Sequence, residues 1–195
     1  MQHGHTLVLV GMSHRVASVG VRERYVVASN DLPANLTALR SIEGVHEACI
    51  LSTCNRTEAM VATDRPELVA ATIRSHLFRN AAEQETYTWS GAQALFHVFR
   101  VAAGLDSLVV GESEVLGQLK RAGDAARECG AMGPLLEALI TRALHGGKRV
   151  RSETELGLGT LSVARVGIEV AGRALGEFRT KRALVIGAGE TGVLV

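Results

Sequence analysis

The sequence predicts an α+β or α/β protein, in which a small ferredoxin-like α/β sandwich with a helical extension precedes the truncated start of a Rossmann-type domain. Short apolar runs at residues 6–12, 48–51 and 59–63 are typical of buried strands. Longer segments with apolar residues at helical spacing lie among and after these runs, and a glycine-rich loop follows one more apolar run near the end of the sequence. We therefore expect a first domain over residues 1–156 and part of a second over residues 157–195.

The composition excludes several classes of protein. No apolar run approaches the length of a membrane span, and residues 6–12 are too few for the core of a signal peptide. Three cysteines without regular spacing argue against a disulfide framework and favour a reducing compartment, so we expect a cytoplasmic protein. A net charge of +1 does not by itself indicate a nucleic-acid partner, and the histidines lack metal-ligand spacing, so we expect no metal.

The first two long helices are predicted by the residues at their N-termini. Asp31 precedes a helix through about Ser41, because Pro33 stands within its first turn. The segment Asp64-Arg65-Pro66-Glu67 has capping-box spacing and begins a helix that should reach about residue 79. Together with the three strands, these helices form the predicted sandwich.

Three further helices make up the predicted helical extension. Ser90 precedes the first, which should end at Gly104. The other two span about residues 112–129 and 134–151. The apolar face of the first helix is expected to consist of Leu95, Phe99 and Ala102.

The second part of the chain begins after a glycine-bearing stretch at residues 155–160, which is typical of a domain boundary. Residues 162–178 predict an amphipathic helix, and residues 183–186 predict a strand that leads into a glycine loop at 187–192. The loop has the G-x-G-x-x-G spacing of dinucleotide-binding domains, although an ordinary strand-to-helix turn can carry the same glycines. Because the completing elements do not follow, we expect this chain to begin such a domain without finishing it, and to bind a dinucleotide poorly.

Cys54 is the strongest candidate for a catalytic residue. It stands just after the predicted strand at residues 48–51, among Thr53, Asn55 and Arg56. Polar neighbours and a nearby positive charge favour the thiolate, which is the form in which a cysteine acts as a nucleophile. A lone cysteine is more often a partly buried structural thiol. A core cysteine needs no such polar neighbours, so we interpret Cys54 as a nucleophile.

Several segments together resemble the glutamyl-tRNA reductase family, whose members catalyse the first step of five-carbon tetrapyrrole, or porphyrin, biosynthesis. The resemblance implies a catalytic domain and the beginning of an NADPH-binding domain. It does not extend to the helical dimerisation domain through which full-length members form homodimers. The matching segments run in order along nearly the whole chain: residues 10–15, 21–24, 51–58, 104–112, 116–118, 148–154 and the glycine loop.

The resemblance implies an oxidoreductase that converts glutamyl-tRNA to glutamate-1-semialdehyde. In the family, the cysteine matching Cys54 attacks the ester between glutamate and its tRNA, and hydride from NADPH reduces the resulting thioester. His97 matches a histidine that is important for activity. The substrate-binding positions match Thr53, Cys54, Asn55, Arg56, Ser107, Glu112, Ser113, Glu114 and Gln118. The cofactor-binding positions match Gly187, Ala188, Gly189, Glu190, Thr191 and Gly192. The next enzyme of the pathway, an aminomutase, is a further implied partner.

These residues also have structural interpretations. Arg56 is suited to bind the substrate carboxylate, but a salt bridge to Glu58 or Glu47 would also explain its presence. His97 lies at the margin of the apolar face of its helix, where it can transfer a proton, orient the substrate or only support the fold. Three other candidates have simple alternative roles as turn caps, helix caps or exposed surface: Ser107, Glu112 and Gln118.

The sequence departs from the family pattern at two places. The usual Ala-Pro after the first strand is Ala17-Ser18, and the usual Glu-Pro-Gln is Glu112-Ser113-Glu114. Glu114 replaces a neutral amide by a carboxylate and adds negative charge beside an anionic substrate. Strict specificity for glutamate therefore does not follow from the resemblance.

Two other functions remain open from the sequence. A diverged relative would keep the thioester chemistry of Cys54 and act as a thioesterase or acyl carrier without reduction. A non-catalytic module would instead bind tRNA or a protein partner. A basic cluster on a late helix either contacts the tRNA backbone or forms a solvated face: Arg142, His145, Lys148, Arg149 and Arg151.

Overall fold

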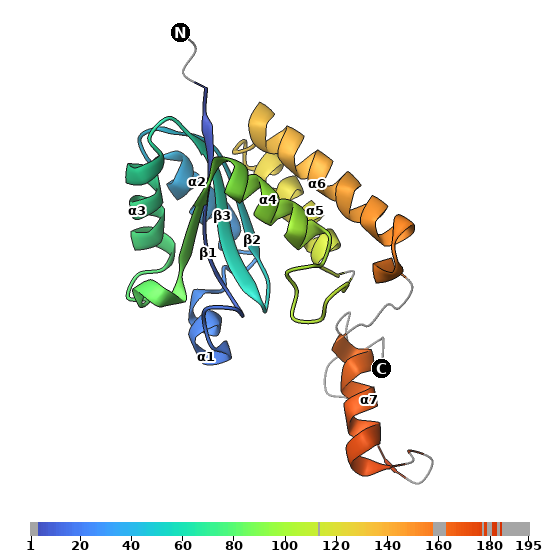
Figure 1. The fold of residues 1–195 in the computed structure, drawn as a ribbon. Coiled ribbons are helices and arrows are strands. Elements are labelled where there is room, and N and C mark those ends of the chain that lie inside the picture. Colours follow the sequence, from blue (N-terminus) through green and yellow to red (C-terminus); the bar gives the residue numbers. More distant parts are fainter. Residues whose placement is uncertain are drawn as a thin grey trace.

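The computed structural model describes residues 4–112, 114–157 and 163–176, together with residues 178, 181, 182 and 184. Its centre is a four-stranded sheet in the order β2-β3-β1-β4, in which each neighbouring pair is antiparallel (Figure 1). The strands are β1 (Thr6–Ser13), β2 (Val45–Ser52), β3 (Arg56–Thr63) and β4 (Tyr87–Ser90). The first three confirm the predicted strands.

Helices cover both faces of the sheet. All eight residues of β3 are buried, which requires packing on both sides. Figure 1 shows α3 on one side of the sheet and α4 and α6 on the other. With α2 between β1 and β2 and α3 between β3 and β4, the chain follows the β-α-β-β-α-β order of the ferredoxin-like sandwich. The helices are α1 (Val19–Arg22), α2 (Leu32–Arg40), α3 (Pro66–Leu77), α4 (Gly91–Ala102), α5 (Glu114–Glu128), α6 (Pro134–Glu153) and α7 (Val163–Leu175).

The second part of the chain is described only in outline. The predicted amphipathic helix is present as α7, which Figure 1 shows apart from the sheet, beyond the end of α6. Its Ile168 and Leu175 are exposed. The predicted glycine loop at residues 187–192 and most of the predicted strand before it lie outside the described residues. Within the part of the chain that is described, no helix is long and apolar enough to cross a membrane.

Three details of the sequence prediction are wrong. The edge strand β4 was not predicted, because its four residues are mostly exposed and show no apolar alternation. The buried face of α4 contains Ala94, Val98, Val101 and Ala102, whereas Leu95 is 48% exposed, since α4 lies against both the sheet and α6. The first turn of α3 has no side-chain cap; Asp64 instead lies 3.5 Å from His46.

The buried carboxylate of Glu47 connects the sheet to the N-terminus of α6. Glu47 follows an irregularity in β2 and is 4% exposed. Its Oε1 accepts the backbone N–H of Leu135 at 3.0 Å, and its Oε2 accepts that of Leu136 at 2.6 Å. These are N–H groups that a helix cannot pair internally, and they lie at the positive end of the helix dipole. A side chain from the sheet therefore caps α6.

We predict that Glu47→Gln lowers the free energy of unfolding by about 1–3 kcal/mol, because the amide presents only one acceptor oxygen to two buried N–H groups. Urea unfolding monitored by circular dichroism measures the change. Glu137→Gln is the matched control. Glu137 lies in the first turn of α6, which Glu47 caps, but its side chain is exposed, so this change should have little effect on the free energy of unfolding. Equal losses in the two variants would contradict the capping role.

Candidate active site

Cys54 lies at the tip of the turn between β2 and β3 and is exposed, as predicted. The Thr53 hydroxyl accepts the backbone N–H groups of Asn55 and Arg56, each at 3.1 Å, and the Thr53 N–H donates to the Arg56 carbonyl at 2.8 Å. Arg22 Nε lies 3.4 Å from the carbonyl oxygen of Cys54. The thiol therefore stands on a turn whose backbone is fixed by hydrogen bonds.

Arg56 is buried rather than presented to solvent. Its side chain is 2% exposed, and its Nη1 donates to Glu58 Oε1 at 2.9 Å. Both Nη atoms lie 3.3 Å from Asp106 Oδ2, and Nη2 also donates to the Asp106 carbonyl. Burial lowers the pKa of Arg56, but Glu58 and Asp106 outweigh this effect and the net pKa is raised. The N–H donors of the Arg56 guanidinium are thus paired with acidic residues of the protein itself.

Glu58 organises the residues around it. It is 1% exposed, and its Oε1 accepts hydrogen bonds from Arg56, from the Tyr87 hydroxyl at 2.5 Å and from His97 Nε2 at 2.7 Å. Burial raises the pKa of Glu58, but Arg56 and His97 lower it more, to about 2. An ionised carboxylate can only accept, so His97 carries a proton on Nε2 and Nδ1 remains for another partner.

His97 lies on the wall of a pocket of about 300 Å³. Its side chain keeps 14% of its surface exposed. The pocket opens at the end of β1, beside the first residue of β3, since Ser13 pairs with Arg56 in the sheet. The residues that line it are Ser13, Arg15, Val16, Tyr87, Trp89, His97, Arg100 and Asp106.

The loop that contains Ser107 is closed and anchored. Gly104 and Gly111 have φ angles of 74° and 87°, and the Gly111 N–H donates to the Gly104 carbonyl at 2.9 Å. Asp106 connects the loop to Arg56 through both its carboxylate and its carbonyl. Ser107 is 5% exposed, and its buried hydroxyl has no hydrogen-bond partner among the described residues. A buried hydroxyl without a partner is uncommon in folded proteins and requires an explanation.

The remaining predicted substrate residues lie elsewhere. Glu112 is 8% exposed and its carbonyl accepts Arg151 Nη2 at 2.6 Å, whereas Ser113 lies outside the described residues. Glu114 begins α5. Gln118 is half-buried and lines a different pocket, of about 380 Å³, with Ile50, Ser52 and residues of the segment before α2. The structure therefore brings His97 and the Cys54 turn to one end of the sheet but does not place Gln118 in the same pocket as His97.

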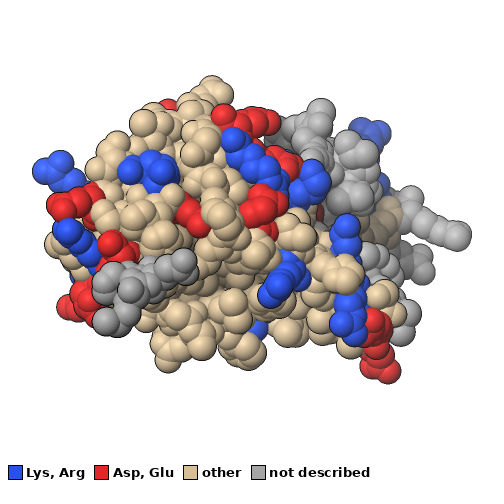
Figure 2. Space-filling model, turned by 90° about the horizontal axis from the view of Figure 1, so that it is seen from above, with Lys and Arg blue, Asp and Glu red and all other residues tan. Residues whose placement is uncertain are grey.

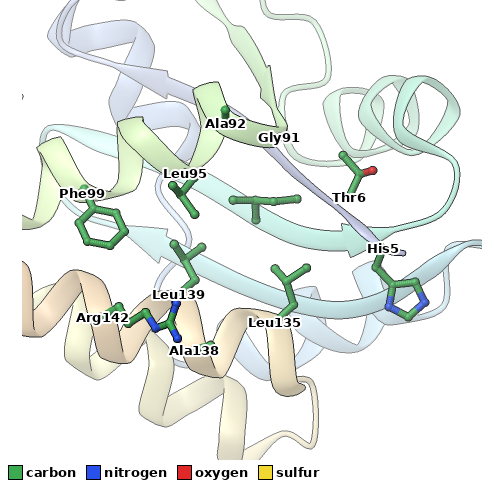
Figure 3. Close-up of a pocket in the computed structure, with 11 residues that line it drawn as sticks. His5, Thr6, Gly91, Ala92, Leu95, Phe99, Leu135, Ala138, Leu139 and Arg142 are labelled. Atoms are coloured by element: carbon green, nitrogen blue, oxygen red, sulfur yellow. The ribbon is translucent and has the colours of Figure 1, made fainter. Parts of the chain in front are cut away.

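One groove is lined by none of the predicted catalytic or substrate-binding residues. This largely apolar groove of about 540 Å³ lies between the start of β1, α4 and α6, with Leu95, Phe99, Leu135 and Leu139 on its walls (Figure 3). On the face shown in Figure 2, acidic and basic side chains are intermixed, in keeping with the small net charge. In the basic cluster of α6, Arg149 pairs with Glu153 at 2.9 Å.

Comparison with known proteins identifies the family. A sequence model described as "Glutamyl-tRNAGlu reductase, N-terminal domain" matches residues 10–154. The chain belongs to this family. It is 42% identical over 189 residues to glutamyl-tRNA reductase 2 of Anaeromyxobacter dehalogenans, covering 96% of this chain and 42% of that protein. A glutamyl-tRNA reductase of Solibacter usitatus is 42% identical over 190 residues, covering 94% and 45%.

A solved structure agrees with the sequence comparison. Glutamyl-tRNA reductase from Methanopyrus kandleri superposes with a TM-score of 0.69 at 34% identity, covering 94% of this chain and 44% of that one. The chain thus spans less than half the length of the reductases it matches. The resemblance found in the sequence is confirmed at the level of the family.

Sequence reasoning missed several residues that the structure places around His97 in this member of the reductase family. Glu58 was considered only as a surface partner of Arg56, and no role was assigned to Asp106, Arg15, Arg100 or Tyr87. One signal was present: Glu58 directly precedes the apolar run at residues 59–63, and a carboxylate buried beside such a run needs a partner. The partners come from distant segments, which no local pattern shows: Glu58 and His97 are 39 residues apart, and Arg15 and Asp106 are 91 residues apart.

We predict that Glu58→Gln lowers the stability at neutral pH by about 3 kcal/mol, since the pKa of Glu58 is depressed from 4.5 to about 2 on folding. A carboxylate whose pKa is lowered on folding stabilises the fold fully above pH 4.5, and this stabilisation is lost as the pH falls toward 2. The difference in the free energy of unfolding between wild type and variant should therefore become smaller as the pH falls from 5 to 3. Urea unfolding at several pH values measures it, with exposed Glu153→Gln as control; parallel stability curves would contradict the prediction.

Proposed function

We propose that this chain binds glutamyl-tRNA and forms a thioester on Cys54, as part of an NADPH-dependent glutamyl-tRNA reductase. The whole reaction yields glutamate-1-semialdehyde, the first step of five-carbon tetrapyrrole biosynthesis. The observation that carries the proposal is the exposed thiol of Cys54 on a fixed turn, at the end of the sheet where β3 also positions the Glu58–His97 pair. Membership of the reductase family supports the assignment of substrate.

The first step is an acyl transfer. The Cys54 thiolate attacks the carbonyl carbon of the ester that joins glutamate to the tRNA ribose, and a C–S bond forms. The C–O bond to the ribose then breaks, and its oxygen leaves as a hydroxyl group after taking up a proton. The products are a glutamyl thioester on Cys54 and uncharged tRNA. No electron transfer is needed in this step.

We assign to His97 the role of supplying this proton. Because Nε2 is held by Glu58, a protonated ring presents its second N–H, on Nδ1, away from the carboxylate. The carboxylate of Glu58 lies 2.7 Å from Nε2 and fixes the orientation of the ring. Glu58 thus acts as a positioning residue for His97, in the same sense in which a carboxylate orients the histidine of a catalytic triad.

The substrate contacts follow from the burial of each residue. Thr53 and Asn55 form the turn around Cys54, and the unpartnered Ser107 hydroxyl is available to a polar group of the glutamyl moiety. Arg56 can bind the substrate carboxylate only by exchanging Asp106 for it. The other proposed substrate contacts are Glu112, Ser113, Glu114 and Gln118.

The reduction requires groups beyond the described residues. The loop at residues 187–192 is proposed to hold NADPH, which supplies a hydride when bound. A homodimer, a cytoplasmic location and transfer of the product to an aminomutase belong to the same proposal. The roles proposed above for the residues around Cys54 apply only to the acylation step.

We predict that the chain, given glutamyl-tRNA without NADPH, forms a glutamyl adduct on Cys54 and slowly releases glutamate. Intact-mass spectrometry of the quenched reaction detects the adduct. Cys54→Ser should abolish it, whereas Cys129→Ser, at a half-buried cysteine of α5's C-terminus, should not. His97→Ala should slow formation by on the order of a hundredfold. Unchanged glutamate release in Cys54→Ser would refute the assignment of Cys54 as the nucleophile.

Iodoacetamide should react with Cys54 and Cys49 at very different rates at neutral pH. Cys54 is exposed and should be carboxymethylated first. Cys49 is buried in β2, and burial raises its pKa to about 12, so it should remain unmodified in the folded chain. Peptide mapping after timed labelling measures the order. Modification of Cys49 at a rate comparable to Cys54 would contradict the described core.

A further inference from the structure

The mouth of the His97 pocket carries more positive than negative charge. Three guanidinium groups converge on Asp106: Arg15 Nε at 2.5 Å, Arg56 Nη2 at 3.3 Å and Arg100 Nη2 at 3.6 Å. The second carboxylate of this described cluster, Glu58, pairs with Arg56. Two carboxylates thus face three guanidinium groups. The unmatched charge lies toward solvent, because the Arg15 and Arg100 side chains are 51% and 43% exposed.

Aromatic rings stand beside these guanidinium groups. Tyr87 and Trp89 are two residues apart on β4, so their side chains lie on one face of the strand, and both line the pocket. Trp89 is 37% exposed at the edge of the sheet. Phe96 on α4 is 65% exposed, and Arg100 Cζ lies 6.0 Å from the centre of its ring. A ligand here would meet flat apolar surface and positive charge together.

We propose that this pocket binds the 3′-terminal nucleotide of the tRNA, with its base stacked on Trp89 and its phosphate beside Arg15 and Arg100. Aromatic rings next to arginines are the surfaces on which proteins bind unpaired nucleotides. The pocket has about 300 Å³, at the lower end of the range for small-molecule sites. It therefore accommodates one nucleotide rather than a paired stem.

The inference rests on the proposed function and extends it to the RNA. The amino acid of a charged tRNA is esterified to the ribose of an unpaired terminal nucleotide, so that nucleotide lies one ester bond from the acyl group. With the base on Trp89, the ribose lies toward His97 on the wall of the same pocket. His97 would then face the oxygen that leaves when Cys54 is acylated.

Trp89 provides the test, because it is the only tryptophan of the chain and its fluorescence reports on this pocket alone. The intact chain is titrated with 5′-phosphorylated CCA trinucleotide and, separately, with glutarate at the same ionic strength. We expect saturable quenching by CCA and none by glutarate. Arg15→Gln and Arg100→Gln should each weaken CCA binding by on the order of tenfold at low salt.

Arg65→Gln is the matched control for the two arginine variants. Arg65 is 48% exposed and pairs with one carboxylate, Glu43, as Arg15 pairs with Asp106, but it follows the opposite end of β3. CCA should bind this variant as it binds the wild type. An equal loss in all three variants would show a non-specific charge effect and would overturn the proposed site.

Two further outcomes would also overturn it. Quenching by glutarate and not by CCA would show that the pocket receives the substrate carboxylate instead of the nucleotide. Absence of quenching by CCA, in a preparation that still forms the acyl adduct on Cys54, would remove the nucleotide site and leave the proposed function intact. Quenching by CCA in a chain that forms no adduct would support the site and refute the thioester step.

Discussion

The buried ion network of Arg56, Glu58 and Asp106 is the constraint on which the candidate site depends. Three charged side chains that are almost fully buried must be paired, since an uncompensated buried charge costs several kcal/mol. Their pairing joins β3 to the loop at residues 104–112, and Glu58 adds Tyr87 of β4 and His97 of α4. Segments up to 50 residues apart are thereby held in one arrangement.

In this arrangement, the buried charged groups fix the positions of their neighbours, and other groups remain exposed to solvent. Glu58 fixes the orientation of His97, Asp106 holds the loop that carries Ser107, and neither needs to reach solvent. The groups left accessible are the Cys54 thiol, one face of His97, and the guanidinium groups of Arg15 and Arg100. The buried pairs thus hold these accessible groups in fixed positions relative to one another.

Strands and helices with strong apolar periodicity could be predicted from the sequence. Elements and contacts that depend on residues distant in the sequence could not. The three long strands and the helices α2 to α7 lie where apolar spacing and turn residues placed them. The strand β4 was missed because a short, half-exposed edge strand has no local signature. The exposure of Cys54 followed from its position after a buried strand. For Arg56, a salt bridge to Glu58 was one of the interpretations open from the sequence. Its burial and its second partner Asp106 could not be predicted, because folding brings Asp106 to it from 50 residues away.

The ionised carboxylate of Glu58 holds His97 with the proton on Nε2, so that Nδ1 of the neutral ring is unprotonated. Long-range proton–nitrogen correlation NMR of the intact, ¹⁵N-histidine-labelled chain measures this directly, at a pH where the His97 ring is neutral. We expect a protonated Nε2 and an unprotonated Nδ1 for His97, assigned by comparison with His97→Gln. A neutral His97 ring that carries its proton on Nδ1 would contradict it.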